Sequence, residues 1–254
     1  MNEPSRVGQV LSGYRIERLL GSGSMGEVYL GRSGNDTAVV KLLAPAIAAN
    51  PDLRIRFQRE WEVLAKLPPH PNVVAVRAVR LDDAQPHLIM EYIPGSSLGS
   101  LIRQGPMAPD RVARVGRDAA AGLAVVHRHG LIHRDVKPDN LILTPQGRTC
   151  LVDFGIAKDL FRSTLTEPDQ LLGTPAYMAP EQWEDEAQAD ARCDVFALGA
   201  TLYHLLAGRP PFEGEDFFEI ADKALAGDFR PLREAAPGVS QGLDRIVTTM
   251  LSAS

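Results

Sequence analysis

Residues 131–143 read LIHRDVKPDNLIL, in which a polar, highly charged segment lies between two apolar flanks. Leu131 and Ile132 precede the polar segment, and residues 141–143 follow it as Leu-Ile-Leu. Apolar residues on both sides predict that the flanks are buried as short strands and that the segment between them forms a rigid loop. Two interpretations are open at this point: a solvated polar turn, or a loop whose charges serve chemistry.

The residue types in this loop suit phosphoryl transfer. Such a site needs a carboxylate that orients a hydroxyl and accepts its proton, a cation near the moving group, and an oxygen ligand for Mg²⁺. Asp135, Lys137 and Asn140 supply these groups in that order. The segment LVDFG at 151–155 adds an apolar strand that ends in Asp153, a hard oxygen ligand suited to Mg²⁺. A polar turn would explain either segment alone, but not both at this spacing.

A glycine-rich segment, GSGSMGEV at 21–28, lies between two predicted strands. Glycines at such a turn let backbone amides approach phosphate oxygens without a Cβ in the way. A Rossmann site would need a helix directly after the last glycine, but EVYLGR continues as a strand, and the Gly-Lys-Ser/Thr of a Walker loop is absent. The pattern leaves a hairpin turn or a flap folded over a nucleotide.

Lys41 lies in an otherwise apolar strand, AVVKLL. One interpretation is a lysine that reaches solvent from an edge strand. The other is an ion pair with Glu60, which the following amphipathic helix carries beside its apolar stripe. A carboxylate partner would hold the ammonium where it can meet phosphate oxygens. These two residues alone do not decide between the interpretations.

The order of predicted elements divides the chain in two. The first ninety residues read mostly as short strands, with one amphipathic helix at 52–67. After them the segments are mainly helical, as at 110–130, which ends at Gly130. We therefore predict an α+β fold with a small antiparallel β lobe that contains one helix (about 1–92), a connector (about 91–97) and a larger, mainly helical lobe (about 97–254).

Composition argues against several function classes. The 254 residues are 44% hydrophobic, and the net charge is −5 with acids and bases interspersed, so we expect a sizeable core and no nucleic-acid partner. Cys150 and Cys193 lack metal-binding or redox spacing and favour a reducing compartment. The N-terminus lacks a signal-peptide pattern, and the most apolar stretch, VFALGATLYHLLAG, is shorter than the ~20 residues of a bilayer span. We predict a cytoplasmic domain without a membrane segment.

Taken together, the motifs resemble the protein kinase family. GSGSMGEV, VVK, HRDVKPDN, DFG and GTPAYMAPE follow the family's signature order and cover nearly the whole chain. The style of DFGIAK and LLAGRPPF resembles the eukaryotic-like serine/threonine kinases of bacteria. The resemblance implies a bilobal fold, ATP as the phosphoryl donor, Mg²⁺ with Mn²⁺ as an alternative, and protein Ser/Thr hydroxyls as acceptors. Kinases of this group often form homodimers through the small lobe.

The resemblance also implies roles for individual residues. The catalytic and metal-binding set is Lys41 on the α- and β-phosphates, Glu60 as its partner, Asp135 as the catalytic carboxylate, Lys137 on the γ-phosphate, and Asn140 and Asp153 on the metal. The nucleotide-binding set is Leu20, Gly21, Ser22, Gly23, Ser24, Met25, Gly26, Glu27 and Val28, with Met90 as gatekeeper and Glu91 and Tyr92 as hinge residues. A hydrophobic spine is expected at Leu64, His133 and Phe154.

Substrate class and regulation follow from two further features of the resemblance. Lys137 and Thr174, the latter in GTPAYMAPE, match the serine/threonine pattern and make Thr174 a substrate-positioning residue. Arg134, next to Asp135, resembles kinases that need activation-loop phosphorylation. The expected phosphorylation sites are Thr166, with Thr164 and Ser163 as secondary sites.

The sequence departs from the family pattern at two places. Val39 stands where the family usually has Ala, and its extra methyl groups would press on the adenine site. The chain ends at MLSAS, before a helix whose arginine would pair with Glu181, so we expect a truncated C-terminus and a poorly anchored segment after about Gly238.

Two other functions compete with a protein kinase. A pseudokinase scaffold predicts the loss of at least one of Lys41, Asp135, Asn140 and Asp153, and all four are present. A small-molecule kinase shares the fold but usually lacks the GTPAYMAPE segment.

Overall fold

The computed structural model describes residues 6–23, 26–45, 49–81, 85–155, 175–184 and 190–252. The chain forms two compact units. The first comprises residues 1–69 and 74–93, and the second comprises residues 70–73 and 94–254.

The first unit is built on a six-stranded antiparallel sheet with the strand order β1-β2-β3-β4-β6-β5. Its strands are β1 (Val10–Leu11), β2 (Tyr14–Gly23), β3 (Gly26–Ser33), β4 (Asp36–Leu43), β5 (Val76–Arg80) and β6 (His87–Glu91). The pairing of β2 with β3 extends to Gly23 opposite Gly26, so the predicted glycine-rich hairpin is confirmed.

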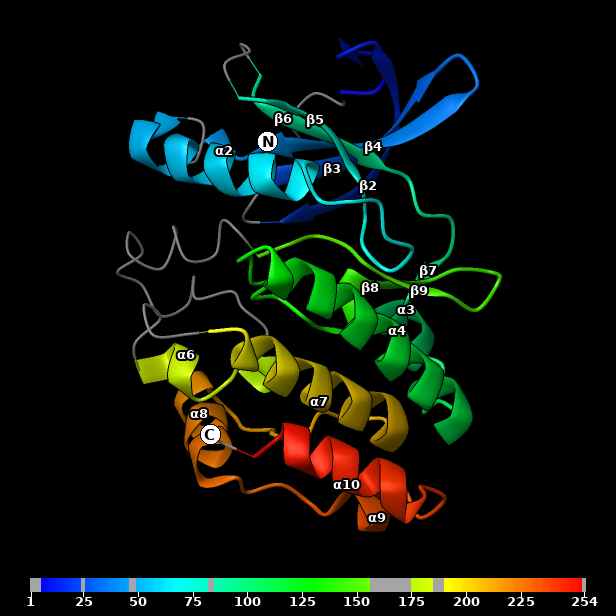
Figure 1. The fold of residues 1–254 in the computed structure, drawn as a ribbon, viewed down its shortest axis with the longest axis vertical. Coiled ribbons are helices and arrows are strands. Elements are labelled where there is room, and N and C mark those ends of the chain that lie inside the picture. The colour runs from blue at the N-terminus through cyan, green and yellow to red at the C-terminus, as the bar shows by residue number, and fades with distance from the viewer. Residues whose placement is uncertain are drawn as a thin grey trace. The chain divides into compact units, whose positions relative to one another are not determined.

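One face of this sheet is covered by a cluster of buried side chains: Ile16, Tyr29, Ala38, Val40, Leu42 and Ile89. Helix α2 (Pro51–Ala65) packs against β5, as Figure 1 shows. The apolar stripe predicted for this helix is confirmed at Phe57, Trp61 and Leu64, which are all buried. The stripe therefore fixes the face that α2 presents to the sheet.

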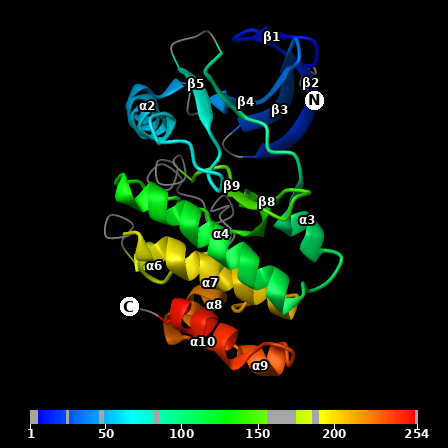
Figure 2. The same cartoon turned by 45° about the vertical axis from the view of Figure 1, so that its right-hand side comes forward.

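The second unit is mainly helical. Helices α4 (Pro109–Arg128), α7 (Arg192–Ala207) and α10 (Gln241–Met250) lie side by side, with α7 in contact with both of the others (Figures 1 and 2). This unit also contains a three-stranded sheet of β7 (Ser96–Ser97), β8 (Leu141–Leu143) and β9 (Thr149–Leu151). Its shorter helices are α3 (Leu98–Ile102), α6 (Glu181–Glu184), α8 (Phe217–Ala226) and α9 (Leu232–Ala235). Two 3₁₀ turns are η1 (Pro138–Asn140) and η3 (Pro175–Tyr177). The predicted α+β class is confirmed.

The most apolar stretch of the sequence forms α7, the buried helix that the sequence predicted. It ends at Gly208, whose φ of 76° lies in the left-handed region that glycine adopts without a steric penalty. No helix in the described ranges combines the length and apolar character that a bilayer span requires.

The C-terminal segment corrects one expectation. We expected the residues after about Gly238 to be poorly anchored, but Val247 and Leu251 are almost fully buried, while Ile246 remains exposed. Gly199 of α7 has no Cβ, and this absence lets α10 approach closely. A Cβ at this position would lie only 2.8 Å from the Cβ of Met250. The apolar side of α7 therefore supplies the cover that was expected to be missing.

Residues 70–73 belong to the second unit, although the sequence placed them in the small lobe. Asn72 donates from Nδ2 to the carbonyl of Thr149 at 2.7 Å, and the amide of Leu151 donates to the carbonyl of Asn72 at 2.9 Å. Val73 also forms a parallel bridge with Leu151. These contacts with β9 connect the short segment to the second unit.

Thr201 provides a test of packing in α7. Its side chain is fully buried, and among the described residues its Oγ1 has no hydrogen-bond partner. Because valine has nearly the same shape without the hydroxyl, Thr201→Val should raise the free energy of unfolding by about 1 kcal/mol. The measurement is denaturant-induced unfolding.

The matched control is Thr144→Val. Thr144 is also buried, but its Oγ1 accepts a hydrogen bond from the Arg148 amide at 3.2 Å. Losing this bond should lower the free energy of unfolding by about 1 kcal/mol. Equal destabilisation of both variants would show that the Thr201 hydroxyl is hydrogen-bonded in the folded protein.

Candidate active site

The polar loop at 131–140 is held by a carboxylate from another element. The backbone amides of His133 and Arg134 donate to Asp194 at 2.8 and 2.7 Å. His127 Nε2 lies 2.7 Å from the same carboxylate, whose residue is fully buried in the first turn of α7. Asp194 therefore joins α4, α7 and the loop at one point.

This anchor explains one difference from the sequence prediction. Residues 141–143 form β8, but Leu131 and Ile132 form no strand. Arg134 has a φ of 60°, a left-handed conformation that non-glycine residues adopt rarely. Hydrogen bonds to Asp194, instead of strand pairing, hold the chain on this side of the loop.

The sequence analysis did not identify Asp194. A signal was available, because Asp194 is the only carboxylate in the otherwise mostly apolar segment RCDVFALGATLYHLLA. A buried charge of this kind requires partners. The sequence does not show that those partners lie about sixty residues earlier in the chain.

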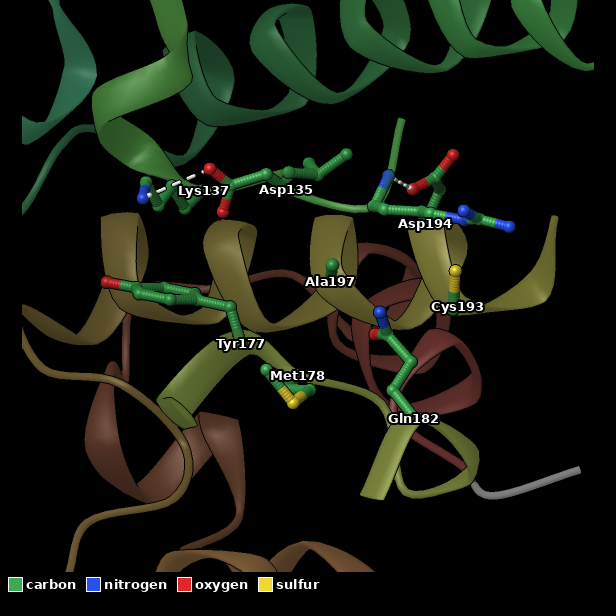
Figure 3. A pocket seen from close by; sticks show the side chains of 10 residues that line it. Asp135, Lys137, Tyr177, Met178, Gln182, Cys193, Asp194 and Ala197 are labelled. Carbon is green, nitrogen blue, oxygen red and sulfur yellow. Dashed lines mark hydrogen bonds and ion pairs between the residues drawn. The ribbon is translucent and has the colours of Figure 1, made fainter. Parts of the chain in front are cut away.

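The structure brings together two predicted catalytic residues, Asp135 and Lys137, and one predicted metal ligand, Asn140. Asp135 Oδ2 accepts a hydrogen bond from Asn140 Nδ2 at 2.8 Å and lies 3.2 Å from Lys137 Nζ, as the dashed line in Figure 3 shows for the lysine. Asn140 Nδ2 also donates to the Asp135 carbonyl at 2.9 Å and lies 3.4 Å from the Asp153 carbonyl. The carboxylate of Asp135 is thus oriented by an amide and a cation from its own loop.

The segment that carries Asp153 runs along this loop. The amide of Val152 donates to the Asn140 carbonyl at 3.0 Å, and the amide of Gly155 donates to the His133 carbonyl at 2.8 Å. Asp153 itself has a left-handed φ of 54°. Backbone hydrogen bonds on both sides therefore support an unfavourable conformation at the predicted metal ligand.

His133 connects the two segments from inside. Its ring stacks on Phe154 with 4.4 Å between centroids, and its Nε2 lies 3.2 Å from the Val152 carbonyl. The Asp135 amide lies 3.3 Å from His133 Nδ1. Burial lowers the pKa of His133 below its ordinary value, although the nearby carboxylates have the opposite effect. The lowered pKa favours a neutral ring at neutral pH. The expected packing of His133 against Phe154 is confirmed.

Lys41 is not an edge-strand lysine. It lies on β4, between β3 and β6, and only 3% of its surface is exposed. Since Val40 and Leu42 belong to the covered cluster, the alternation of a strand directs Lys41 to the opposite face. Glu60 is half-buried on α2, and its pairing with Lys41 stays a prediction.

The remaining predicted site residues are those for nucleotide binding, phosphorylation and substrate positioning, and the structure describes only some of them. Leu20, Gly21, Ser22 and Gly23 end β2, Gly26, Glu27 and Val28 begin β3, and Met90 and Glu91 end β6, followed directly by Tyr92. Outside the described residues lie Ser24, Met25, Ser163, Thr164, Thr166 and Thr174.

A pocket lies beside Asp135 and Lys137 within the second unit (Figure 3). Its walls come from the polar loop at 131–140, from the segment that runs from η3 to α6, and from α7. The lining residues are Arg134, Asp135, Val136, Lys137, Tyr177, Met178, Gln182, Cys193, Asp194 and Ala197. Burial raises the pKa of the Cys193 thiol, so this cysteine is an inert part of the wall at neutral pH.

Asp194→Asn tests the anchor. The substitution keeps the shape but removes the charge, and it replaces one of the two accepting oxygens with an NH₂ group that can only donate. One backbone amide therefore loses its acceptor, and the free energy of unfolding should fall by about 2–3 kcal/mol. Asp190→Asn is the control, because the hydrogen bonds that Asp190 accepts in the described structure come from the guanidinium and the backbone amide of Arg192 at an exposed site. Thermal and denaturant unfolding measure both variants. Equal stability of the two would show that the loop does not depend on Asp194.

Comparisons with known proteins agree with this geometry. The family profile described as the protein kinase domain matches residues 14–253. The chain is 36% identical over 248 residues to the serine/threonine-protein kinase PknB of Mycobacterium leprae, covering 94% of this chain and 39% of that protein. It is 36% identical over 249 residues to PknB of Mycobacterium tuberculosis, covering 94% of this chain and 39% of that protein. It is 35% identical over 249 residues to PknE of Mycobacterium bovis, covering 96% of this chain and 43% of that protein.

The chain spans about two fifths of the length of these curated relatives. Members of the matched family use ATP and a divalent metal ion and act on proteins. The profile covers nearly all of the described residues, including both units. The chain therefore belongs to the protein kinase family.

Proposed function

We propose that this domain is a serine/threonine protein kinase that transfers the γ-phosphate of ATP to hydroxyl groups of proteins, its own activation loop included. The observation that carries the proposal is the Asp135 carboxylate, which Asn140 and Lys137 hold within 2.8 and 3.2 Å in one anchored loop. The names of the relatives, all serine/threonine-protein kinases, support the choice of acceptor.

In the proposed reaction Asp135 acts on the acceptor. Its carboxylate accepts a hydrogen bond from the Ser or Thr hydroxyl and aims the oxygen at the γ-phosphorus. A bond forms between this oxygen and phosphorus, the bond from phosphorus to the bridging oxygen of ADP breaks, and the hydroxyl proton passes to Asp135. The hydrogen bond from Asn140 keeps the carboxylate in one orientation for this step.

Lys137 is the cation of the loop. Its Nζ lies 3.2 Å from Asp135, and its side chain is 19% exposed, so the charge stays at the site without full burial. A positive charge there stabilises the negative charge on the moving phosphoryl group.

Asn140 and Asp153 are the proposed metal ligands. Asn140 is 5% exposed and uses Nδ2 for its contacts with Asp135, which leaves the amide oxygen as its metal-binding atom. Together with a carboxylate from Asp153, this oxygen set fits a hard divalent cation, Mg²⁺ with Mn²⁺ as an alternative. When bound, the ion offsets the charge of the phosphates and orients them.

The first unit is proposed to hold the nucleotide. Lys41 would contact the α- and β-phosphates with Glu60 as its partner, and the β2–β3 hairpin would cover the phosphates with backbone amides. Glu91 and Tyr92 would offer backbone groups to the adenine. A cytoplasmic location and a homodimer formed through this unit stay predictions.

Asp135→Asn should retain ATP binding and lose phosphoryl transfer by a factor of roughly 10² or more, because an amide cannot take the hydroxyl proton. The assay is transfer from labelled ATP to dephosphorylated casein, with ATP binding measured by calorimetry. Asp110→Asn, an exposed residue in the first turn of α4, is the matched control and should keep full activity. Turnover of the Asp135 variant above about a tenth of the wild-type rate, a barrier change of only ~1.4 kcal/mol, would remove Asp135 from this role.

Phosphorylation of the activation loop is expected at Thr166, with Thr164 and Ser163 as secondary sites. A phosphate adds roughly −1.5 to −2 charges, and the guanidinium of Arg134 beside Asp135 would pair with this negative charge. Mass spectrometry of active enzyme should find phosphate on at least one of the three, and Thr166→Ala should lower activity more than Thr164→Ala. Fully active enzyme without phosphate on any of them would contradict the prediction.

A further inference from the structure

The segment at 6–9, which precedes β1, is attached to the glycine-rich hairpin by an ion pair. Arg6 donates from Nε to Glu27 Oε2 at 2.9 Å, and the two side chains are 32% and 28% exposed. Glu27 lies at the start of β3, one residue after Gly26. The contact therefore joins a segment outside the predicted kinase motifs to the pair of strands that is proposed to cover the phosphates.

The segment at 6–9 has a defined position on β2. The amide of Gly8 donates to the Ile16 carbonyl, and the amide of Ile16 donates to the Gln9 carbonyl, both at 2.8 Å. The amide of Gln9 donates to the Arg6 carbonyl at 3.1 Å. Ile16 is 1% exposed and belongs to the buried cluster of the sheet. The Arg6 side chain therefore extends from a backbone that is bonded to the core of the first unit.

The side chain of Glu27 lies on the face of the sheet opposite that of Lys41. Glu27 pairs directly with Leu42, a member of the buried cluster, whereas Val28 pairs with Lys41. Directly paired residues share a face of the sheet, and successive residues alternate between the two faces. Arg6 consequently contacts the hairpin on the side away from the phosphate contacts proposed for Lys41, and its role is to position the hairpin rather than to touch the nucleotide.

The hairpin is also held from the side of β4. Gly26 has a φ of 127°, and a Cβ there would lie only 1.9 Å from the Leu42 carbonyl oxygen. This close approach fixes the backbone next to Glu27 against β4, while the ion pair acts on the Glu27 side chain. Two separate contacts therefore meet at the start of β3, among the backbone amides that are proposed to bind phosphate.

We propose that Arg6 is a positioning residue for the nucleotide. By pairing with Glu27, it holds the start of β3 in the position from which the amides of the hairpin bind the phosphates of ATP. The inference rests on the proposed kinase function and adds a residue to its nucleotide site. It predicts that loss of the ion pair weakens ATP binding and leaves kcat and KM for a protein substrate unchanged.

The first test removes the ion pair from either side. Arg6→Gln and Glu27→Gln should each raise the Kd for ATP with Mg²⁺, measured by calorimetry, and the KM for ATP about fourfold, an effect of the size expected for a partly exposed ion pair. The kcat and the KM for dephosphorylated casein should stay at their wild-type values. The double variant Arg6→Gln/Glu27→Gln should match either single variant, because each substitution removes the same interaction.

The second test restores the pair in the opposite sense. Arg6→Glu places two carboxylates together and should raise the Kd for ATP about tenfold. Exchange of the two residues, Arg6→Glu/Glu27→Arg, keeps the summed length of the side chains and should return the Kd to within about 1.5-fold of wild type.

Arg32 and Glu17 provide the matched control. Their ion pair joins the same two strands, with 2.7 Å between Arg32 Nε and Glu17 Oε1, and the side chains are 49% and 35% exposed. Arg32 lies near the end of β3 that is remote from the hairpin. Arg32→Gln should therefore change the thermal midpoint about as much as Arg6→Gln and leave ATP binding unchanged.

Three results would overturn the inference. Unchanged ATP binding by Arg6→Gln would reduce the pair to a surface contact. Tighter binding by Glu27→Gln would show that the carboxylate acts on the nucleotide directly through its charge. Equal weakening by Arg32→Gln would show that the effect does not depend on the hairpin. Wild-type protein that binds ATP without phosphorylating casein or itself would overturn the proposed kinase activity alone, because calorimetry would still measure the effect of Arg6.

Discussion

The polar loop at 131–140 depends on the buried carboxylate of Asp194. It accepts two backbone hydrogen bonds, from His133 and Arg134, and contacts His127, so both of its oxygens have partners inside the protein. A buried charge is tolerated only when it is paired in this way. The left-handed backbone of Arg134 is supported by the same bonds, and it leads directly into Asp135. The position of the proposed catalytic carboxylate therefore follows from a residue that takes no part in the chemistry.

Helix α7 organises the site through two of its polar side chains. Asp194 in the first turn holds the polar loop at 131–140, and His204 in the last turn contacts the Tyr177 hydroxyl. Between them the helix is mostly apolar and buried against α4 and α10, which makes it a rigid base for both contacts. A single buried helix can thus set the distance between the carboxylate of Asp135 and the opposite wall of the pocket.

The loop and the segment with Asp153 behave as one structural element. Backbone hydrogen bonds join Val152 to Asn140 and Gly155 to His133, and Asn140 in turn bonds Asp135. Close packing leaves little freedom, since a Cβ at Gly155 would lie 2.9 Å from the Asp135 Cβ. The proposed proton acceptor and the proposed metal ligands are consequently oriented together, and transfer of a phosphoryl group depends on such positioning. A pseudokinase would have no need to preserve this set.

Much of this protein was predictable from the sequence because the responsible signals are local. The β2–β3 hairpin and the apolar stripe of α2 depend on residue types at short spacings. The order of the kinase motifs predicted the family, and the residue types within those motifs were the basis for the roles proposed for Asp135, Lys137 and Asn140. Other features were decided by distant partners. Leu131 and Ile132 form no strand because Asp194 binds the adjacent amides, residues 70–73 join the second unit through β9, and Val247 is covered because Gly199 lets α10 approach. Periodicity shows which residues are buried, but which buried groups meet depends on the packing of helices and strands that are far apart in the chain.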